Sequence, residues 1–338
     1  MTHRVTLIPG DGIGPEITEA TRQAVEATGA SVAWDVQLGG VAALEATGTP
    51  LPDATIESVR QTGVALKGPL TTPVGSGFRS VNVALRREFD LYANVRPART
   101  LVPGGRYDDV DIVLVRENTE GLYVGFETFI PVDGDPKAVA QASSIVTRHG
   151  CERIARFAFE YAVRHARRKV TICHKANILK TVSGLFLDVA RGIGEEYRDR
   201  VEVDDLIIDA AAMKLVLDPS RFDMIVTTNM FGDILSDEIA GLVGGLGLAP
   251  GANIGAGVAL FEAVHGSAPD IAGKGVANPS ALMLAAVEML DHLGEERAAQ
   301  RLRTALLATL RDDGIRTRDL GGNATTVEFA DAVLRRLA

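Results

Sequence analysis

Short apolar segments alternate with amphipathic helical patterns along the whole chain, and this alternation constrains the fold more than any other feature. The apolar segments predict strands at residues 4–8, 32–36, 64–66, 91–95, 112–115, 170–173, 206–208, 224–227 and 258–261. The amphipathic segments predict helices at residues 15–28, 80–88, 149–165, 178–196, 231–243, 279–292 and 295–311. Such alternation is typical of an α/β fold with a largely parallel core sheet. The polar, glycine-bearing segment 123–140 is interpreted as a hairpin or an arm.

The charge balance is acidic, with 35 Lys and Arg against 44 Asp and Glu and a formal net charge of −9. Because phosphate binding requires a basic face, this balance argues against nucleic acid as the main partner. No apolar stretch approaches a membrane span, and the one near the N-terminus is too short for a signal peptide. Cys151 and Cys173 show no pairing pattern and are predicted to be inert core thiols. A reducing cytoplasm is the expected location.

The loop after the first predicted strand, residues 10–16, is where a dinucleotide fingerprint would be expected. It reads Gly-Asp-Gly-Ile-Gly-Pro-Glu and lacks G-x-G-x-x-G spacing, because Pro15 and Ile17 stand where the third glycine is needed. No G-x-x-x-x-G-K-[ST] phosphate loop occurs in the chain. A dinucleotide would therefore be bound without the usual Rossmann fingerprint.

Three arginines are placed to bind an anion. Ser80 is a good N-cap, and Ser80, Asn82 and Arg86 lie within two turns of the helix that follows it. Arg96 and Arg116 each follow a predicted strand, where α/β proteins place ligand-contacting groups. Because each guanidinium can hold a carboxylate through two hydrogen bonds, the set is suited to a polycarboxylate. The alternative for any one of them is a solvated surface arginine.

Acidic residues form a second group. Asp233 and Asp237, four residues apart, share one face of a helix, and Asp205 and Asp209 bracket an apolar run. Oxygen ligands of this kind favour Mg²⁺ or Mn²⁺ over Zn²⁺. A pair favoured by the helix dipole remains an equally good interpretation.

Lys175 and Tyr123 follow strands or loops and have side chains that can transfer a proton, but their spacing alone carries little weight. The glycine-rich stretch 244–255, continued by residues 261–274, would allow the backbone to approach a flat ligand closely. An ordinary surface loop is the less attractive interpretation at this length.

Together these segments resemble the β-decarboxylating dehydrogenase family of isocitrate, 3-isopropylmalate, homoisocitrate and tartrate dehydrogenases. The resemblance covers nearly the whole chain and is most specific at residues 116–123, 174–177, 229–237 and 265–270. It implies an isocitrate/isopropylmalate dehydrogenase-like two-domain α/β fold without a G-x-G-x-x-G Rossmann motif. The implied large cofactor-binding domain joins residues 1–96 to 245–338, and residues 97–244 form a small dimer-forming domain.

The resemblance also implies roles for individual residues. Arg86, Arg96 and Arg116 correspond to the arginines that bind the substrate carboxylates, assisted by Ser80 and Asn82. Metal ligation is implied for Asp209, Asp233 and Asp237, and Asp205 is a neighbouring acid rather than a ligand. Lys175 and Tyr123 are the implied catalytic residues. In this family Lys175 and Asp209 would serve the partner's site, which implies a homodimer with shared active sites.

NAD is the implied cofactor. The implied cofactor-binding residues are Lys67, Thr71, Thr72, Asn177, His265, Gly266, Ser267, Ala268, Pro269, Asp270, Ile271 and Asn278. Asp270 corresponds to the position at the adenosine ribose, where a carboxylate accepts hydrogen bonds from both hydroxyls and repels a 2′-phosphate.

Isocitrate is the expected substrate, because Ser80 and Asn82 suit a third carboxylate better than an isopropyl group. The expected reaction is metal-dependent oxidative decarboxylation to 2-oxoglutarate and carbon dioxide. Homoisocitrate, 3-isopropylmalate or a related 2-hydroxy acid is the alternative substrate. A non-catalytic regulatory subunit is a further, minor alternative.

Overall fold

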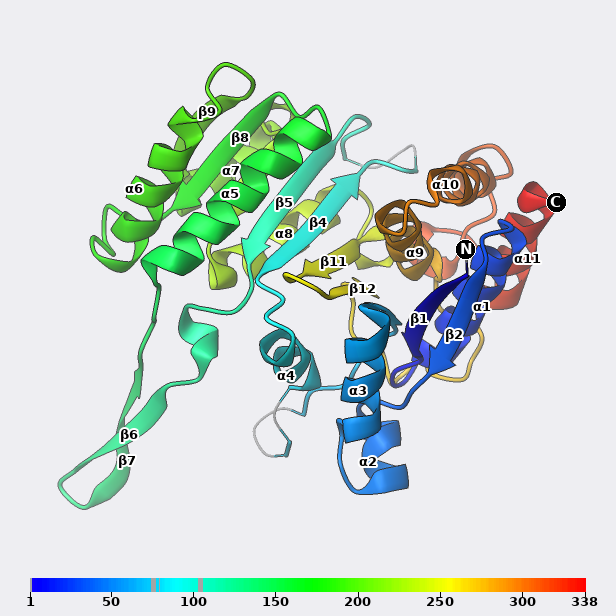
Figure 1. Ribbon diagram of the computed structural model, residues 1–338, viewed down its shortest axis with the longest axis horizontal. Helices are drawn as coiled ribbons and strands as arrows, with labels where there is room; N and C mark the ends of the chain where they lie inside the picture. Colours follow the sequence, from blue (N-terminus) through cyan, green and yellow to red (C-terminus); the bar gives the residue numbers. More distant parts are fainter. Residues whose placement is uncertain (1, 74–76, 79, 103–105) are drawn as a thin grey trace. The chain divides into compact units, whose positions relative to one another are not determined.

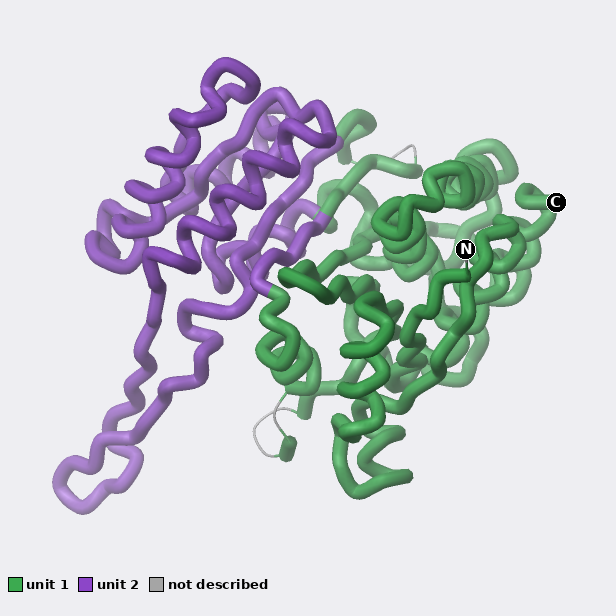
Figure 2. Tube along the Cα trace, viewed as in Figure 1, with its two compact units in different colours: residues 1–91, 97–110, 240–338 green, residues 92–96, 111–239 purple. Residues whose placement is uncertain are grey.

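The computed structural model describes residues 2–73, 77–78, 80–102 and 106–338. The chain divides into two compact units. Unit 1 comprises residues 1–91, 97–110 and 240–338, and unit 2 comprises residues 92–96 and 111–239 (Figure 2). Within the described residues, no helix combines the length and apolar character needed to cross a bilayer.

In the described part of unit 1, strands lie in the order β2-β1-β3-β12-β11. Their bounds are β1 His3–Ile8, β2 Val32–Val36, β3 Val64–Lys67, β11 Pro250–Ile254 and β12 Ala259–Ala263. Strand β1 pairs in parallel with β2 and β3, and β3 pairs in parallel with β12, whereas β11 runs antiparallel to β12. Every residue of β3 is buried, as expected for a parallel strand covered on both faces.

Helices and short 3₁₀ turns complete unit 1 (Figure 1). They are α1 Gly14–Ala27, α2 Val41–Thr47, α3 Asp53–Thr62, α4 Val81–Glu88, η3 Leu246–Leu248, α9 Ser280–His292, α10 Glu296–Arg311, η4 Arg318–Leu320 and α11 Thr326–Leu337. Local sequence explains several ends: Pro15 opens α1, Gly63 in the left-handed region closes α3, and Thr325 and Glu328 form a capping box on α11. One core cluster joins Ile8 of β1, Leu85 of α4 and Leu260 of β12.

Unit 2 has strands in the order β4-β5-β10-β8-β9. Their bounds are β4 Ala93–Arg99, which continues into unit 1, β5 Asp111–Glu117, β8 Lys169–His174, β9 Glu202–Ile207 and β10 Met224–Thr227. Strand β10 pairs in parallel with β5 and β8, and β8 pairs in parallel with β9. The helices and turns are η1 Leu122–Val124, α5 Arg148–Arg164, α6 Val182–Glu195, α7 Ile208–Leu217, η2 Pro219–Arg221 and α8 Asn229–Leu242, whose last turn is counted with unit 1. Arg116 lies near the carboxyl end of β5 and Lys175 follows β8, whereas Arg96 lies within β4 rather than after the strand as predicted.

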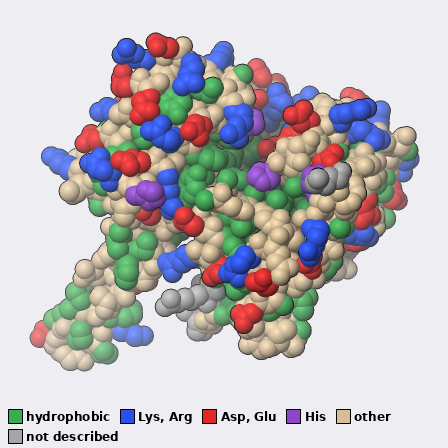
Figure 3. Space-filling view, viewed as in Figure 1, with side chains coloured by type: hydrophobic (Ala, Val, Ile, Leu, Met, Phe, Trp, Pro, Cys, Tyr) green, Lys and Arg blue, Asp and Glu red, His purple; other side chains and the backbone are tan. Residues whose placement is uncertain are grey.

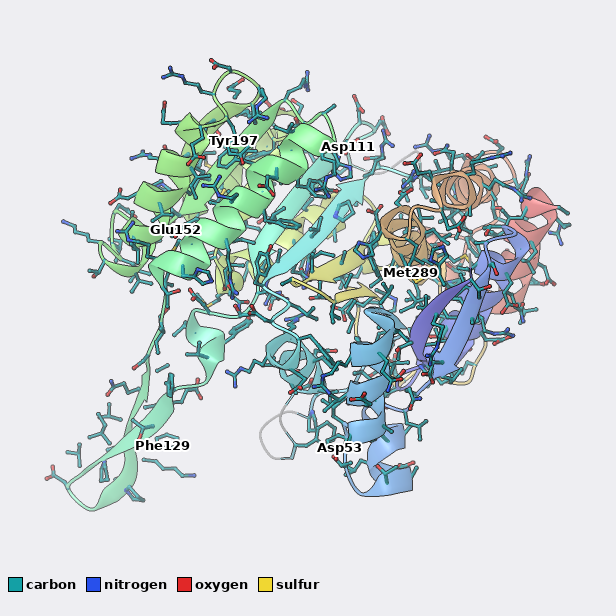
Figure 4. All side chains as sticks on the ribbon, in the orientation of Figure 1. Asp53, Asp111, Phe129, Glu152, Tyr197 and Met289 are labelled. Atoms are coloured by element: carbon teal, nitrogen blue, oxygen red, sulfur yellow. The ribbon has the colours of Figure 1, made fainter. Side chains whose placement is uncertain are left out.

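A separate antiparallel hairpin projects from the rest of unit 2 (Figure 1). Its strands are β6 Glu127–Val132 and β7 Asp135–Ala142, and every residue of both is exposed. Phe129, labelled in Figure 4, is 53% exposed, and Figure 3 shows hydrophobic side chains along the hairpin. We call residues 127–142 the arm.

The α/β expectation is confirmed, and two strands, Val32–Val36 and Met224–Thr227, match their predicted bounds to the residue. Strand β11 was not predicted, because it lies in the glycine-rich stretch that was interpreted as a ligand-binding loop. Helices α2, α3, α7 and α11 were also not predicted. Cys151 and Cys173 are free and buried, as expected.

Candidate active site

Asp233, on α8, is the centre of a charged cluster in unit 2. Arg116 donates a hydrogen bond to its Oδ1, and Nη2 of Arg96 lies 3.5 Å from the same oxygen. The Tyr123 hydroxyl donates to Oδ2 over 2.8 Å. Together with Asp237, these residues form what we call the arginine–aspartate cluster. It joins four elements of unit 2, namely β4, β5, η1 and α8.

Arg116 is held in place by α8. Its side chain is 1% exposed, and Nε and Nη2 donate to Oδ1 of Asn229 over 3.0 and 2.7 Å. Gly232 lies one turn after Asn229, and a Cβ there would be 2.6 Å from Cγ of Arg116. The helix therefore supplies both a hydrogen-bond acceptor and the space for the arginine stem, because residues three apart share one helical face.

Arg96 is positioned by neighbours on β4 and α8. Its Nε donates to Asn94 over 2.6 Å and its Nη1 donates to Ser236 over 2.5 Å. The same Nη1 lies 3.5 Å from Oδ1 of Asp237. Burial raises the pKa of Asp237, and the like charge of Asp233 adds to the rise against the opposing effect of Arg96. A bound cation would relieve the repulsion between these two carboxylates.

Lys175 and Asp209 form a second group in unit 2. Lys175 follows β8, Asp209 lies in the first turn of α7, and Nζ of the lysine donates to Oδ1 of the aspartate. This hydrogen bond lowers the pKa of Asp209. Among the described residues, no three His, Cys, Asp or Glu side chains gather in a group that could hold a metal ion. Within one chain, Asp209 therefore does not join Asp233 and Asp237.

Unit 1 has a buried charged network of its own. Nζ of Lys67 lies 2.8 Å from Oε2 of Glu262, and Nη2 of Arg86 lies 3.6 Å from Oε1. Asn253 donates to the same carboxylate over 2.7 Å. Burial alone would raise the pKa of Glu262, but Lys67 and Arg86 lower it to about 2. These side chains line a small pocket together with Asn82.

The N-terminus of α4 carries the polar side chains predicted to determine the substrate. Ser80 caps the helix by accepting a hydrogen bond from the N–H of Val83 over 3.5 Å, and Thr72 donates to its hydroxyl over 3.2 Å. Oδ1 of Asn82 is buried and has no hydrogen-bond partner in the described part of the chain. A buried amide oxygen in that state accepts only from a donor, so a carboxylate ligand would be bound by the NH₂ group of the same amide.

Asp11 connects three segments of unit 1 that surround the predicted cofactor residues. Its Oδ1 accepts from the N–H groups of Val41 and Ala42, over 2.8 and 3.2 Å, and its Oδ2 accepts from the N–H of Thr71 over 2.8 Å. The hydroxyl of Thr71 in turn lies 2.7 Å from that of Ser267. Asp11 thus fixes Thr71 for its contact with Ser267.

Residues 265–271, which follow β12, form the loop predicted to bind the cofactor, and we call it the cofactor loop. The N–H of Ile13 donates to the carbonyl of Ser267 over 2.9 Å, and a Cβ on Gly12, whose φ is +60°, would overlap the same carbonyl. Ala268 adopts a φ of +40°, which is unusual for a residue other than glycine. Burial lowers the pKa of His265, so its ring is neutral near pH 7.

The remaining predicted cofactor residues lie apart in sequence. Asn278 donates to Asp319 over 2.9 Å, and Lys274 donates to the backbone carbonyl of Asp270 over 2.7 Å. Asn177 is exposed in the turn after β8, and it belongs to unit 2. Gly266, Pro269 and Ile271 lie in the loop of unit 1.

Sequence reasoning missed Asp11, Asn229 and Glu262. Asp11 and Asn229 lie within segments that the sequence had singled out, and Glu262 gave a signal of its own, because a carboxylate within the buried strand β12 requires a partner. The contacts of Asp11 and Asn229 are made with residues distant in the sequence, and their spacing gave no indication of them.

Residues 4–333 match the model of the isocitrate/isopropylmalate dehydrogenase family. The chain belongs to this family. A crystal structure of isocitrate dehydrogenase from Methylococcus capsulatus is similar to it, with a TM-score of 0.96, 55% identity and 99% coverage of each chain. The resemblance inferred from the motifs and the fold expected for an isocitrate/isopropylmalate dehydrogenase are confirmed.

Curated members of the isocitrate/isopropylmalate dehydrogenase family are also similar to this chain. The NAD isocitrate dehydrogenase catalytic subunit 5 of Arabidopsis thaliana is 47% identical over 98% of this chain and 88% of its own length. A regulatory NAD isocitrate dehydrogenase subunit of Dictyostelium discoideum is 46% identical over 99% of this chain and 92% of its own. Both are named as mitochondrial, so the expected cytoplasmic location is wrong by this comparison. Unpaired thiols indicate only a non-oxidising compartment, which the mitochondrial names of these relatives also satisfy.

Proposed function

We propose that this chain catalyses the NAD-dependent oxidative decarboxylation of isocitrate to 2-oxoglutarate and carbon dioxide. The observation that carries the proposal is the contact of Asp233 with two arginines and a tyrosine. Two guanidiniums bind carboxylates, the tyrosine supplies a proton, and the aspartate offers oxygen ligands to a cation. Relatives named as isocitrate dehydrogenases over nearly the whole chain support the same reaction.

Arg96 and Arg116 of unit 2 are proposed to bind carboxylates of the substrate. Arg86, the hydroxyl of Ser80 and the NH₂ group of the Asn82 amide, all in unit 1, are proposed to donate hydrogen bonds to the third carboxylate of isocitrate. An isopropyl group in that place would leave buried donors unpaired, at about 1–3 kcal/mol each. Homoisocitrate is the closer competitor, because one extra methylene is worth only about 1–3 kcal/mol in a pocket.

The residues present fit a hard divalent cation, which we propose to be Mg²⁺ or Mn²⁺. Asp233 and Asp237 lie one turn apart on α8 and offer only oxygen ligands. Asp209 would complete the set from a second subunit, in keeping with its place beside Lys175 rather than in the arginine–aspartate cluster. A bound cation would polarise the substrate oxygen and stabilise negative charge that develops there.

The protein's own groups would move the protons. Lys175, held by its contact with Asp209, is proposed to accept the hydroxyl proton of isocitrate as hydride passes to NAD⁺. Tyr123 is proposed to deliver a proton to the enolate that remains after carbon dioxide leaves. Its hydroxyl already donates toward Asp233, where the substrate would be held.

Unit 1 is the proposed NAD-binding body, and the cofactor loop with Lys67, Thr71, Thr72 and Asn278 is the proposed binding site. Asn177 of unit 2 is proposed as a further cofactor contact. The Asp270 side chain is exposed and is proposed to accept hydrogen bonds from the adenosine ribose. The ring of His265 presents a buried Nε2 that has no hydrogen-bond partner among the described residues. Because burial lowers the pKa of this ring, it suits contact with an uncharged nucleobase of the cofactor.

Unit 2 is the proposed dimer-forming body. The arm carries four hydrophobic side chains that are each 43–53% exposed, namely Phe129, Ile130, Val132 and Val139. Because an isolated two-stranded hairpin is marginally stable at best, a second copy of the chain is proposed to cover it. A homodimer would also bring Lys175 and Asp209 of one protomer to the site of the other.

A regulatory role is the second candidate, because the regulatory relative of Dictyostelium discoideum is nearly as similar as the catalytic one of Arabidopsis thaliana. Tyr123, Lys175 and the three aspartates are all present here, which favours the catalytic function.

The test is turnover by the purified chain alone. Isocitrate, homoisocitrate and 3-isopropylmalate are each supplied with NAD or NADP and with Mg²⁺ or Mn²⁺. Highest catalytic efficiency with isocitrate and NAD is expected. No turnover without an added partner chain would favour the regulatory role. Preference for another acid would change the substrate but not the type of reaction.

A further inference from the structure

We propose that His174 is a positioning residue for Lys175, acting as the neutral ring that carries its proton on Nε2. The inference rests on the proposed proton-transfer role of Lys175. His174 is the last residue of β8 and is 6% exposed. Its ring is buried directly before the lysine, and both ring nitrogens have hydrogen-bond partners.

The partners determine the tautomer. The N–H of Ala176 donates to Nδ1 of His174 over 3.1 Å, and a ring nitrogen that accepts a hydrogen bond carries no proton. Nε2 lies 3.2 Å from Oδ1 of Asp205, so it is the nitrogen that donates. The other oxygen of Asp205 accepts from Nε and Nη2 of Arg191, over 3.0 and 2.7 Å. The carboxylate is thereby fixed and holds the ring from the far side.

The turn that follows β8 is fixed around Lys175 by these bonds. The N–H of Lys175 donates to Ser183 over 2.7 Å, and its carbonyl accepts from the N–H groups of Ile178 and Leu179 over 3.1 and 2.9 Å. The next N–H, on Ala176, has His174 as its acceptor. Both peptide groups beside the lysine are therefore held, which sets the point from which Nζ reaches Asp209.

Two variants of His174 separate its two hydrogen bonds. Asparagine places an oxygen where Nδ1 stands and keeps an acceptor for Ala176, whereas glutamine places an N–H where Nε2 stands and keeps only the contact with Asp205. With His174→Gln we expect kcat to fall about 100-fold, with the KM values for isocitrate and NAD little changed, because a misplacement of about 1 Å costs that much. His174→Asn should retain most of kcat. His149→Gln, on an exposed position of unit 2, is the matched control.

Equal kcat losses in the two variants, or none in either, would overturn the inference. Lys175→Met, measured beside them, separates it from the proposed function. An active Lys175→Met variant would overturn both the proton-transfer role of Lys175 and the positioning role of His174. An inactive Lys175→Met variant together with an active His174→Gln variant would overturn only the role of His174. If His174→Gln does not fold, the imidazole nitrogen shifts of the wild-type protein decide. Nδ1 without a proton is expected, and a proton on Nδ1 would overturn the inference.

Discussion

Lys67 and Glu262 form a buried ion pair, with 2.8 Å between Nζ and Oε2, although they are distant in the sequence. Strands β3 and β12 run side by side in parallel and bring the two residues opposite each other in the register. Removal of one partner leaves the other as an uncompensated buried charge, which typically costs about 3–5 kcal/mol.

The pair predicts a specific dependence of stability on pH. The folded-state pKa of Glu262 is about 2, below the ordinary value of 4.5. A lowered carboxyl pKa contributes stability that is present above pH 4.5 and is lost as the pH falls toward about 2, and here the contribution is roughly 3 kcal/mol. Glu262→Gln should be less stable at pH 7 and should lose less stability on acidification, as measured by urea unfolding. Glu45→Gln, at an exposed position of the same unit, should follow the wild type. The prediction would be contradicted if the free energy of unfolding fell equally with acidification in all three proteins.

Gly232→Ala should impair substrate binding although alanine favours helices. Its Cβ would press on Cγ of Arg116 at 2.6 Å and displace the guanidinium from Asn229 and Asp233. We expect a higher KM for isocitrate and a lower thermal midpoint. Gly241→Ala on the same helix meets nothing within 4 Å and should stabilise by about 0.5–1 kcal/mol. If the two variants behaved alike, the space for Arg116 would not be the role of Gly232.

Asp11→Asn should weaken NAD binding more than isocitrate binding. An amide can present one oxygen to Val41 and Ala42, but its NH₂ group then faces the N–H of Thr71, and an unpaired buried donor costs about 1–3 kcal/mol. The measurement is the dissociation constant for NADH by fluorescence. Asp53→Asn, in the first turn of α3, serves as the control (Figure 4). An unchanged dissociation constant for Asp11→Asn would show that Asp11 does not position Thr71 for the cofactor.

Asp270→Lys combined with Ile271→Tyr should shift cofactor preference toward NADP. The change removes a repulsive carboxylate and adds a cation and a hydroxyl for the 2′-phosphate. The ratio of kcat/KM with NAD to that with NADP is the measure, and Ile271→Tyr alone, which leaves the Asp270 carboxylate in place, is the control. A wild-type preference for NADP would refute the role given to Asp270.

Lys175→Met and Tyr123→Phe should each be nearly inactive, but a mixture of the two should recover activity after subunit exchange. In a mixed dimer, one of the two sites would combine an intact lysine from one protomer with an intact tyrosine from the other. About one quarter of wild-type activity is expected if exchange is random and sites are independent, since half of the dimers are mixed and each has one intact site. No recovery after exchange verified by mass spectrometry would argue against shared sites.

The sequence predicted the parts of the fold in which local pattern and tertiary environment agree. Strand β10 is an apolar run buried throughout, and its bounds were predicted to the residue. Strand β11 reads Pro-Gly-Ala-Asn-Ile, which has little intrinsic strand propensity, and it exists because its backbone pairs with β12. Ile208 was predicted to continue a strand, but it begins α7. In these places tertiary contacts outweigh local preference.

The site was predictable to the extent that its residues lie in recognisable motifs. Arg116 and Asp233 were both identified, but their direct contact depends on how β5 and α8 fold together. The roles proposed for Asp11 and His174 rest on hydrogen bonds to backbone N–H groups. A sequence motif gives the identities of side chains and does not show which backbone groups they contact. Geometry was therefore needed to show what holds the predicted residues in place.

The arm has no buried residue in either strand, so its order cannot come from a core of its own. If a second chain covers it, folding of this segment and association of the protomers become one equilibrium, governed by mass action. Dilution would then loosen the arm before it affects the α/β body. Amide deuterium exchange in residues 127–142 should accelerate as the protein is diluted, while exchange in β10 stays constant. The order of the arm would then depend on the protein concentration.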